Sequence, residues 1–80
     1  MPVFDAMMLY RAARTISGLT VRELAAKSDV STATITKLEN GEELKPSTLR
    51  KIRSVLEEHG AEFVPHPRRQ EWVQPKTRGS

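Results

Sequence analysis

Apolar residues recur at helical spacing along most of the chain, and short polar segments separate these stretches. The first stretch places four apolar residues on one face, Ala6, Leu9, Ala13 and Ile16. Asp5 is the expected N-cap and Gly18 the expected stop. The pattern therefore predicts a helix from about residue 5 to residue 17.

Two short helices are expected next. Thr20 and Glu23 have the spacing of a capping box, which predicts a helix beginning at Val21. Ser28-Asp29 should end it, because Ser and Asp side chains bond to the local backbone and Asp tolerates a left-handed conformation.

The second short helix is expected from Ser31, its N-cap, to Glu39, and Asn40-Gly41 should close it. Its apolar residues Ile35 and Leu38 point inward. The residues expected on the other side are Thr32, Ala33, Thr36 and Lys37.

Pro46-Ser47 predicts the start of a further helix, with an apolar stripe and a stop at Gly60. The stripe consists of Leu49, Ile52 and Leu56. Beyond it, residues 61–64 read as a short strand stopped by Pro65, and the rest as extended or irregular chain anchored by Trp72-Val73. The expected fold is a small all-α domain of about four helices, residues 5–60, with a C-terminal strand and basic, proline-rich tail, residues 61–80.

Two short, separately capped helices joined by a tight turn form a helix-turn-helix, whose second helix can enter the major groove of DNA. The apolar side chains expected to hold the pair together are Leu24, Val30, Ile35 and Leu38, with Ala25 at the close approach. Small side chains on the second helix suit a deep position in the groove. Thr can bond to bases or phosphates, methyl groups can contact thymine, and Lys37 can donate to guanine. The alternative is that Thr32, Thr34 and Thr36 are simply exposed residues of a small helical domain.

The segment LTVRELAAKSDVSTATITKLENG, followed by Pro46 and an amphipathic helix, resembles the phage repressor and Cro group of helix-turn-helix regulators. The resemblance covers about residues 6–56 and implies a lambda-repressor-like domain. The chain departs from the family pattern at the turn. Asp29 stands where the family usually has Gly, and Ser28 stands where it frequently has an apolar residue. Many relatives also continue into a fifth helix that supports dimerisation, whereas this chain turns to residues 61–64 and a proline-rich tail.

The resemblance also implies roles for individual residues. The expected base contacts are Thr32, Ala33, Thr36 and Lys37. The expected phosphate contacts are Thr20, Ser31, Asn40, Lys45 and Ser47. The family pattern further pairs an Arg of the first helix with the Glu of LENG, here Arg14 and Glu39, as a structural ion pair.

Charge is distributed unevenly along the chain. The net charge is +3, and it lies in the tail, where Arg68, Arg69, Lys76 and Arg78 face only one acidic residue, Glu71. A basic tail on a neutral body suits an anionic partner such as nucleic acid. The alternative is a solvated tail that only aids solubility.

Several functional classes are disfavoured. An 80-residue chain without Cys has room for one core but not for a large enclosed active site, and His59 and His66 alone do not make a metal site. No catalytic constellation, membrane span or secretory leader is seen. We therefore expect a cytoplasmic, non-enzymatic protein that needs no cofactor or metal.

The expected function is that of a sequence-specific, DNA-binding transcriptional regulator, a repressor, which acts as a homodimer on inverted half-sites. The alternative is an antitoxin that autoregulates its operon and binds a toxin protein through the segment after Gly60. Two locations stay open for Phe63 and Trp72: the side chains pack across a dimer interface, or they cover the core of their own subunit.

Overall fold

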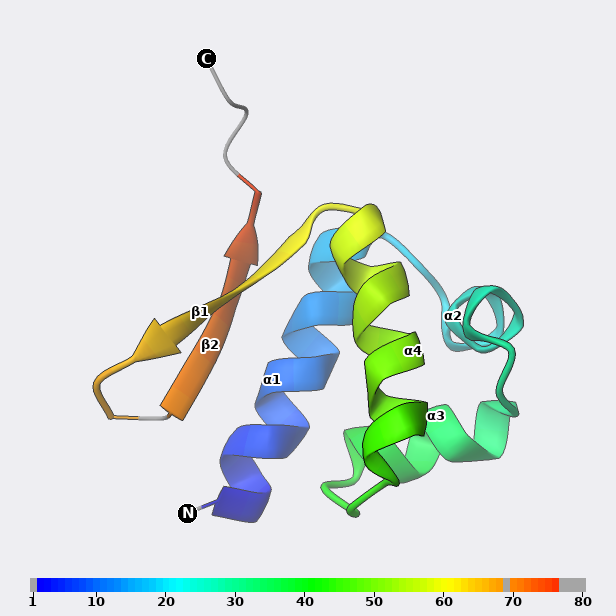
Figure 1. The fold of residues 1–80 in the computed structure, drawn as a ribbon, viewed down its shortest axis with the longest axis horizontal. Coiled ribbons are helices and arrows are strands. Elements are labelled where there is room, and N and C mark those ends of the chain that lie inside the picture. Colours follow the sequence, from blue (N-terminus) through cyan, green and yellow to red (C-terminus); the bar gives the residue numbers. More distant parts are fainter. Residues whose placement is uncertain (1, 69, 77–80) are drawn as a thin grey trace.

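The computed structural model describes the backbone of residues 2–68 and 70–76, and the side chains of residues 8–68 and 70–76. Four helices precede a two-stranded antiparallel sheet. Their bounds are α1 (Pro2–Ser17), α2 (Val21–Ser28), α3 (Thr32–Glu39), α4 (Pro46–Glu58), β1 (Ala61–His66) and β2 (Gln70–Pro75). The helices α1 and α4 lie side by side, α2 packs against α4, and α3 passes behind the start of α4 to pack against α1 and α2 (Figure 1). The β-hairpin lies on the far side of α1 from α2 and contacts both α1 and α4.

The predicted capping signals at the short helices are confirmed. Thr20 Oγ1 accepts a hydrogen bond from Glu23 N at 3.0 Å, and Glu23 Oε1 accepts one from Thr20 N at 2.9 Å, so the capping box is complete. Asp29 adopts the left-handed conformation, with φ 60° and ψ 45°. At α3, the Ser31 hydroxyl accepts from Thr34 N at 3.1 Å.

The predicted start of the first helix is wrong. Helix α1 begins at Pro2 rather than near Asp5. Proline is favoured in the first turn of a helix because its missing N–H would have no partner there. The predicted end of α1 is confirmed, because Gly18, with φ +74°, follows the last helical residue.

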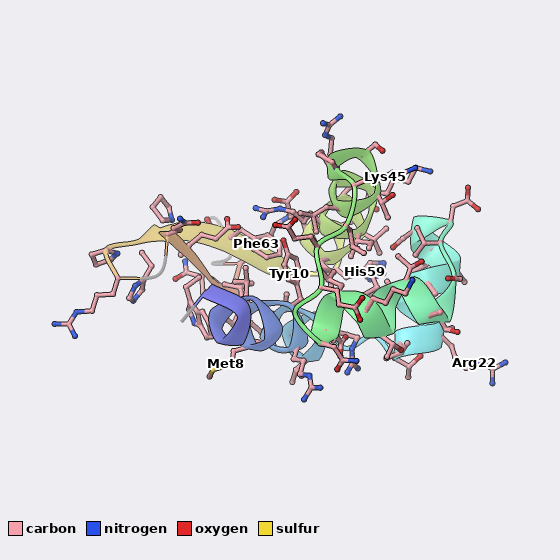
Figure 2. The ribbon with its side chains drawn as sticks, turned by 90° about the horizontal axis from the view of Figure 1, so that it is seen from below. Met8, Tyr10, Arg22, Lys45, His59 and Phe63 are labelled. Atoms are coloured by element: carbon pink, nitrogen blue, oxygen red, sulfur yellow. The ribbon has the colours of Figure 1, made fainter. Side chains whose placement is uncertain are left out.

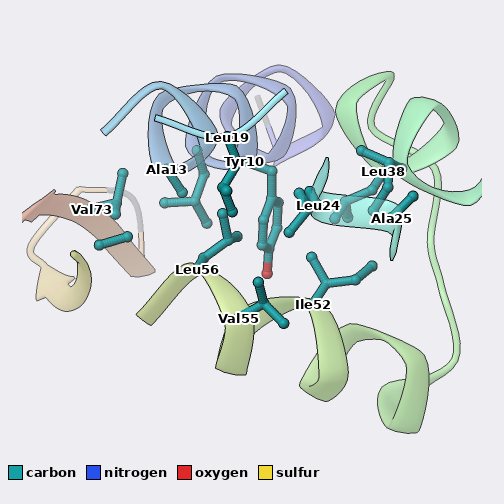
Figure 3. Close-up of a cluster of buried hydrophobic side chains, with 13 residues drawn as sticks. Tyr10, Ala13, Leu19, Leu24, Ala25, Leu38, Ile52, Val55, Leu56 and Val73 are labelled. Atoms are coloured by element: carbon teal, nitrogen blue, oxygen red, sulfur yellow. The ribbon is translucent and has the colours of Figure 1, made fainter. Parts of the chain in front are cut away.

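One core joins the helices and the hairpin. Its fully buried side chains include Leu24, Ile35, Ile52 and Leu56, and the hairpin adds Ala61 and Val73. Figure 3 shows Val73 beside Ala13 of α1 and the Tyr10 ring directed toward α4. Val30, Ile16 and Leu49 are only partly buried and pack against this cluster. The side chain of Ala6, also predicted to face the core, lies outside the described residues.

The strand predicted from residue 61 is confirmed, but it does not stop at Pro65, and the tail expected to be extended or irregular contains a second strand, so the fold is not purely all-α. Strand β1 runs through Pro65 to His66 and pairs with β2 in a register that sets Pro65 opposite Glu71 and Ala61 opposite Pro75. Lys76 N donates to Gly60 O at 2.8 Å, and these two residues continue the same register.

The hydrogen bond between Lys76 N and Gly60 O explains why Pro65 and Pro75 do not stop the strands. Antiparallel pairs alternate between hydrogen-bonded and non-hydrogen-bonded. Since Gly60 and Lys76 are hydrogen-bonded, Pro65 and Pro75 occupy non-hydrogen-bonded pairs, where the backbone nitrogen points away from the partner strand. Neither proline therefore removes a bond of the ladder.

Candidate nucleic-acid interface

Helix α3 has two chemically distinct faces. Ile35 is fully buried and Leu38 is 4% exposed, and both belong to the core. The four residues predicted as base contacts, Thr32, Ala33, Thr36 and Lys37, are all exposed. Their spacing of i, i+1, i+4 and i+5 gathers them on the side of the helix opposite the core.

The residues predicted to contact phosphates lie at the ends of three helices. Thr20 is the N-cap of α2, Ser31 the N-cap of α3, and Asn40 the C-cap of α3. Lys45 and Ser47 flank Pro46 at the start of α4. All five are exposed, and α2 contacts both α3 and α4. Lys45, the N-cap of α4, and Arg22, in the first turn of α2, both project outward in Figure 2.

The N-cap hydroxyls are oriented by the helices that they cap. The Thr20 oxygen accepts from the Glu23 N–H, and the Thr20 hydroxyl proton is shared between the Glu23 carboxylate and any outside acceptor such as a phosphate oxygen. The Ser31 and Thr34 hydroxyl oxygens lie 2.9 Å apart, so one of these hydroxyls donates to the other. Only one proton of this pair is left for an outside acceptor.

The capping box also perturbs Glu23. Hydrogen bonds from the Thr20 backbone and then the Thr20 side chain, with smaller contributions from nearby cations, lower the pKa of its carboxyl group. A hydrogen bond to the charged form of a carboxylate favours ionisation. Glu23 therefore stays ionised at neutral pH and fixes the first turn of α2.

Helix α3 is tied to α1 by the pair that the family resemblance indicated. Arg14 Nε and Nη2 donate to Glu39 Oε2 and Oε1 at 2.5 and 3.1 Å. Arg14 Nη1 also donates to Leu19 O at 3.2 Å, and its hydrogen bond to Glu39 raises the pKa of the guanidinium. The fork-to-fork geometry fixes the C-terminal end of α3 against α1.

A second cluster, which the sequence did not indicate, attaches the hairpin to the helices. Arg53 of α4 donates from Nη1 and Nη2 to the two carboxylate oxygens of Glu71 at 2.6 and 3.0 Å. Its guanidinium carbon lies 4.1 Å from the centroid of the Phe63 ring, and Nη1 lies 3.3 Å from the Tyr10 hydroxyl. The Phe63 and Tyr10 rings, which are near one another in Figure 2, are tilted by 47° with their centroids 6.0 Å apart.

The Arg53 cluster changes the ionisation of two groups. The hydrogen bond to Glu71 raises the pKa of Arg53 further above its ordinary value, and burial raises the pKa of Tyr10. One feature of the sequence points to this cluster: Arg53 comes directly after Ile52, at the border of the apolar stripe of α4. Phe63 and Trp72 are partly buried and pack against the core of their own subunit.

These helices, their two capped N-termini and the polar outer face of α3 make up a helix-turn-helix. A family model described as helix-turn-helix matches residues 11–63. The chain belongs to this helix-turn-helix family, which is of the Cro-like type. The family consists of DNA-binding regulators, which supports a role in transcription regulation. A search of curated proteins found no match.

Metal and membrane sites are not found in the described part of the chain. Among its residues, no group of three or more His, Cys, Asp or Glu side chains is placed to hold a metal ion. No helix within the described ranges is both long and apolar enough to cross a membrane.

Proposed function

We propose that the protein is a sequence-specific transcriptional repressor that inserts α3 into the major groove of operator DNA. The observation that carries this proposal is the division of α3 into two faces. Ile35 and Leu38 fix one face in the core. The opposite face presents three short side chains and one lysine to solvent. Short side chains let the helix backbone lie close to the base edges.

Base reading is assigned to Thr32, Ala33, Thr36 and Lys37, and phosphate binding to the residues at the helix ends. The N-termini of α2 and α3 direct backbone N–H groups and the positive end of the helix dipole outward. The phosphate contacts proposed there and around α4 are Thr20, Ser31, Asn40, Lys45 and Ser47. Such contacts set the register of the protein on the duplex, whereas the base contacts supply specificity.

The repressor is proposed to bind as a homodimer. One recognition helix reads only a few base pairs, so two subunits on inverted half-sites about one helical turn apart, roughly 10 base pairs, are needed for useful specificity. The two-fold symmetry of the dimer then matches the symmetry of the operator.

Selection of bound duplexes from a random DNA library tests the proposal. We expect an enriched sequence with two inverted half-sites and a complex that contains two protein chains. A single asymmetric half-site occupied by one chain would contradict the dimer, and the absence of any enriched sequence would contradict sequence-specific binding. Copurification of the native protein with the product of a neighbouring gene would instead favour the antitoxin alternative.

A further inference from the structure

The exposed face of α3 is lined by methyl groups. Thr32, Ala33 and Thr36 each carry one methyl group at the outer end of an exposed side chain, and Lys37 is the one cation of the helix. Helix α3 contains no Arg, Asn or Gln. Arg and Lys are the residues that bond guanine in the major groove, and Asn and Gln are those that bond adenine, so Lys37 is the one residue of α3 from this set.

The hydroxyl groups next to this face are partly occupied. Ser31 accepts from Thr34 N at 3.1 Å, and the Ser31 and Thr34 oxygens lie 2.9 Å apart. Both side chains therefore stabilise the first turn of α3. The outer face itself carries three methyl groups beside the Thr32 and Thr36 hydroxyls and the Lys37 ammonium, and the base-edge group that matches a methyl group is the C5-methyl of thymine.

We propose that the protein recognises its DNA chiefly through thymine C5-methyl groups, which pack against the methyl groups of Thr32, Ala33 and Thr36. This inference rests on the proposed insertion of α3 into the major groove and names the chemistry that it reads there. Each half-site then contains thymines, on either strand, at two or three successive base pairs.

The spacing of the methyl groups fits this assignment. Thr32 and Thr36 lie one helical turn apart, a rise of about 6 Å, and Ala33 lies between them on the same face. Successive base pairs are separated by about 3.4 Å. The three side chains therefore extend over about two base-pair steps when the helix follows the groove.

The sharpest test changes the DNA alone. Each thymine of the selected half-site is replaced in turn by deoxyuracil, which keeps every hydrogen-bonding group and removes only the C5-methyl. We expect affinity to fall about three- to five-fold at each contacted thymine, as for one buried methyl group. Replacement at thymines outside the half-sites is the matched DNA control and should leave affinity unchanged.

Matched protein variants then assign the contact. Thr36→Ser removes the methyl group and keeps the hydroxyl, whereas Thr36→Val keeps the methyl groups and removes the hydroxyl. Thr36→Ser should abolish the loss caused by deoxyuracil at one thymine, and Thr36→Val should preserve it. Thr15→Ser, at an exposed threonine of α1, is the control and should behave as the parent.

The outcomes separate this inference from the proposed function. Sequence-specific binding that tolerates deoxyuracil at every thymine, or a selected half-site without thymine, would overturn methyl recognition and leave the repressor assignment in place. If deoxyuracil is tolerated and Thr36→Val rather than Thr36→Ser weakens binding to the operator, the hydroxyl is the reading group and the inference is wrong. Failure to select any sequence would refute the proposed function itself.

Discussion

Arg14 of α1 donates two parallel hydrogen bonds to the carboxylate of Glu39 of α3, at 2.5 and 3.1 Å. The Glu39 side chain is 9% exposed and that of Arg14 25% exposed, so the pair is largely withdrawn from water. Because Glu39 is the last residue of α3, this contact fixes the end of the proposed recognition helix to the body of the domain.

Glu39→Gln should destabilise the fold by about 2 to 4 kcal/mol, because it leaves the Arg14 charge without its counter-ion in a half-buried position. Urea unfolding followed by circular dichroism measures the loss. Glu42→Gln, at an exposed position just after α3, is the control and should change the free energy of unfolding by less than about 0.5 kcal/mol. Equal stability of Glu39→Gln and the parent would reject a structural role for the pair.

The capping box predicts a dependence of stability on pH. The folded-state pKa of Glu23 lies below its ordinary value of 4.5, so its contribution is complete above pH 4.5 and is lost as the pH falls through the folded-state pKa. Glu23→Gln should therefore be less stable than the parent at pH 7, and the difference should shrink in acid. Unfolding free energies of both proteins measured from pH 7 down to pH 3 give the comparison, and a constant difference over this range would contradict the prediction.

Arg53 should hold the hairpin on the helices. Arg53→Lys keeps the charge but removes the second hydrogen bond to Glu71 and the stacking on Phe63, so we expect a loss of about 1 to 2 kcal/mol. Amide hydrogen exchange should accelerate in β1 and β2 more than in α2 and α3. Arg50→Lys, at an exposed position of the same helix, serves as the control. Uniform acceleration over the whole chain would assign Arg53 to global stability instead.

The basic tail gives a prediction about salt. Arg68 and Lys76 are exposed at the hairpin turn and after β2, whereas Arg69 and Arg78 lie outside the described residues. Replacing all four with Gln should leave one to three DNA phosphates without a neutralising cation. The slope of log affinity against log salt should then flatten by about 0.9 for each such phosphate, and the preferred base sequence should stay the same. An unchanged slope would assign the tail to solubility or to a protein partner.

Local signals made much of the helical part predictable. The Thr20–Glu23 capping box and the Ser31 cap each depend on residues three positions apart, so a single window of sequence contains both partners. Asp29 likewise takes the left-handed conformation that its side chain tolerates. The outward position of Thr36 follows from the inward position of Ile35.

The hairpin and its attachment were not predictable in this way. Pro65 reads as the end of a strand unless its place in the hydrogen-bonding register is known, and that register depends on the partner strand β2. The contact of Arg53 with Glu71 joins a helix to a strand, which no periodic pattern reveals. Arg14 and Glu39, 25 residues apart, were paired only through the family resemblance.

The central claim, that the outer face of α3 reads bases, is tested most directly by one residue. Lys37→Ala and the parent are compared on the selected operator and on every single base-pair variant of it. Because Lys37 is proposed to donate to a base edge, the substitution should relax discrimination by about 1 to 3 kcal/mol at one or two base pairs of each half-site, with discrimination elsewhere preserved and the fold intact. Equal weakening on every sequence would make Lys37 a phosphate contact and would contradict base reading by this residue.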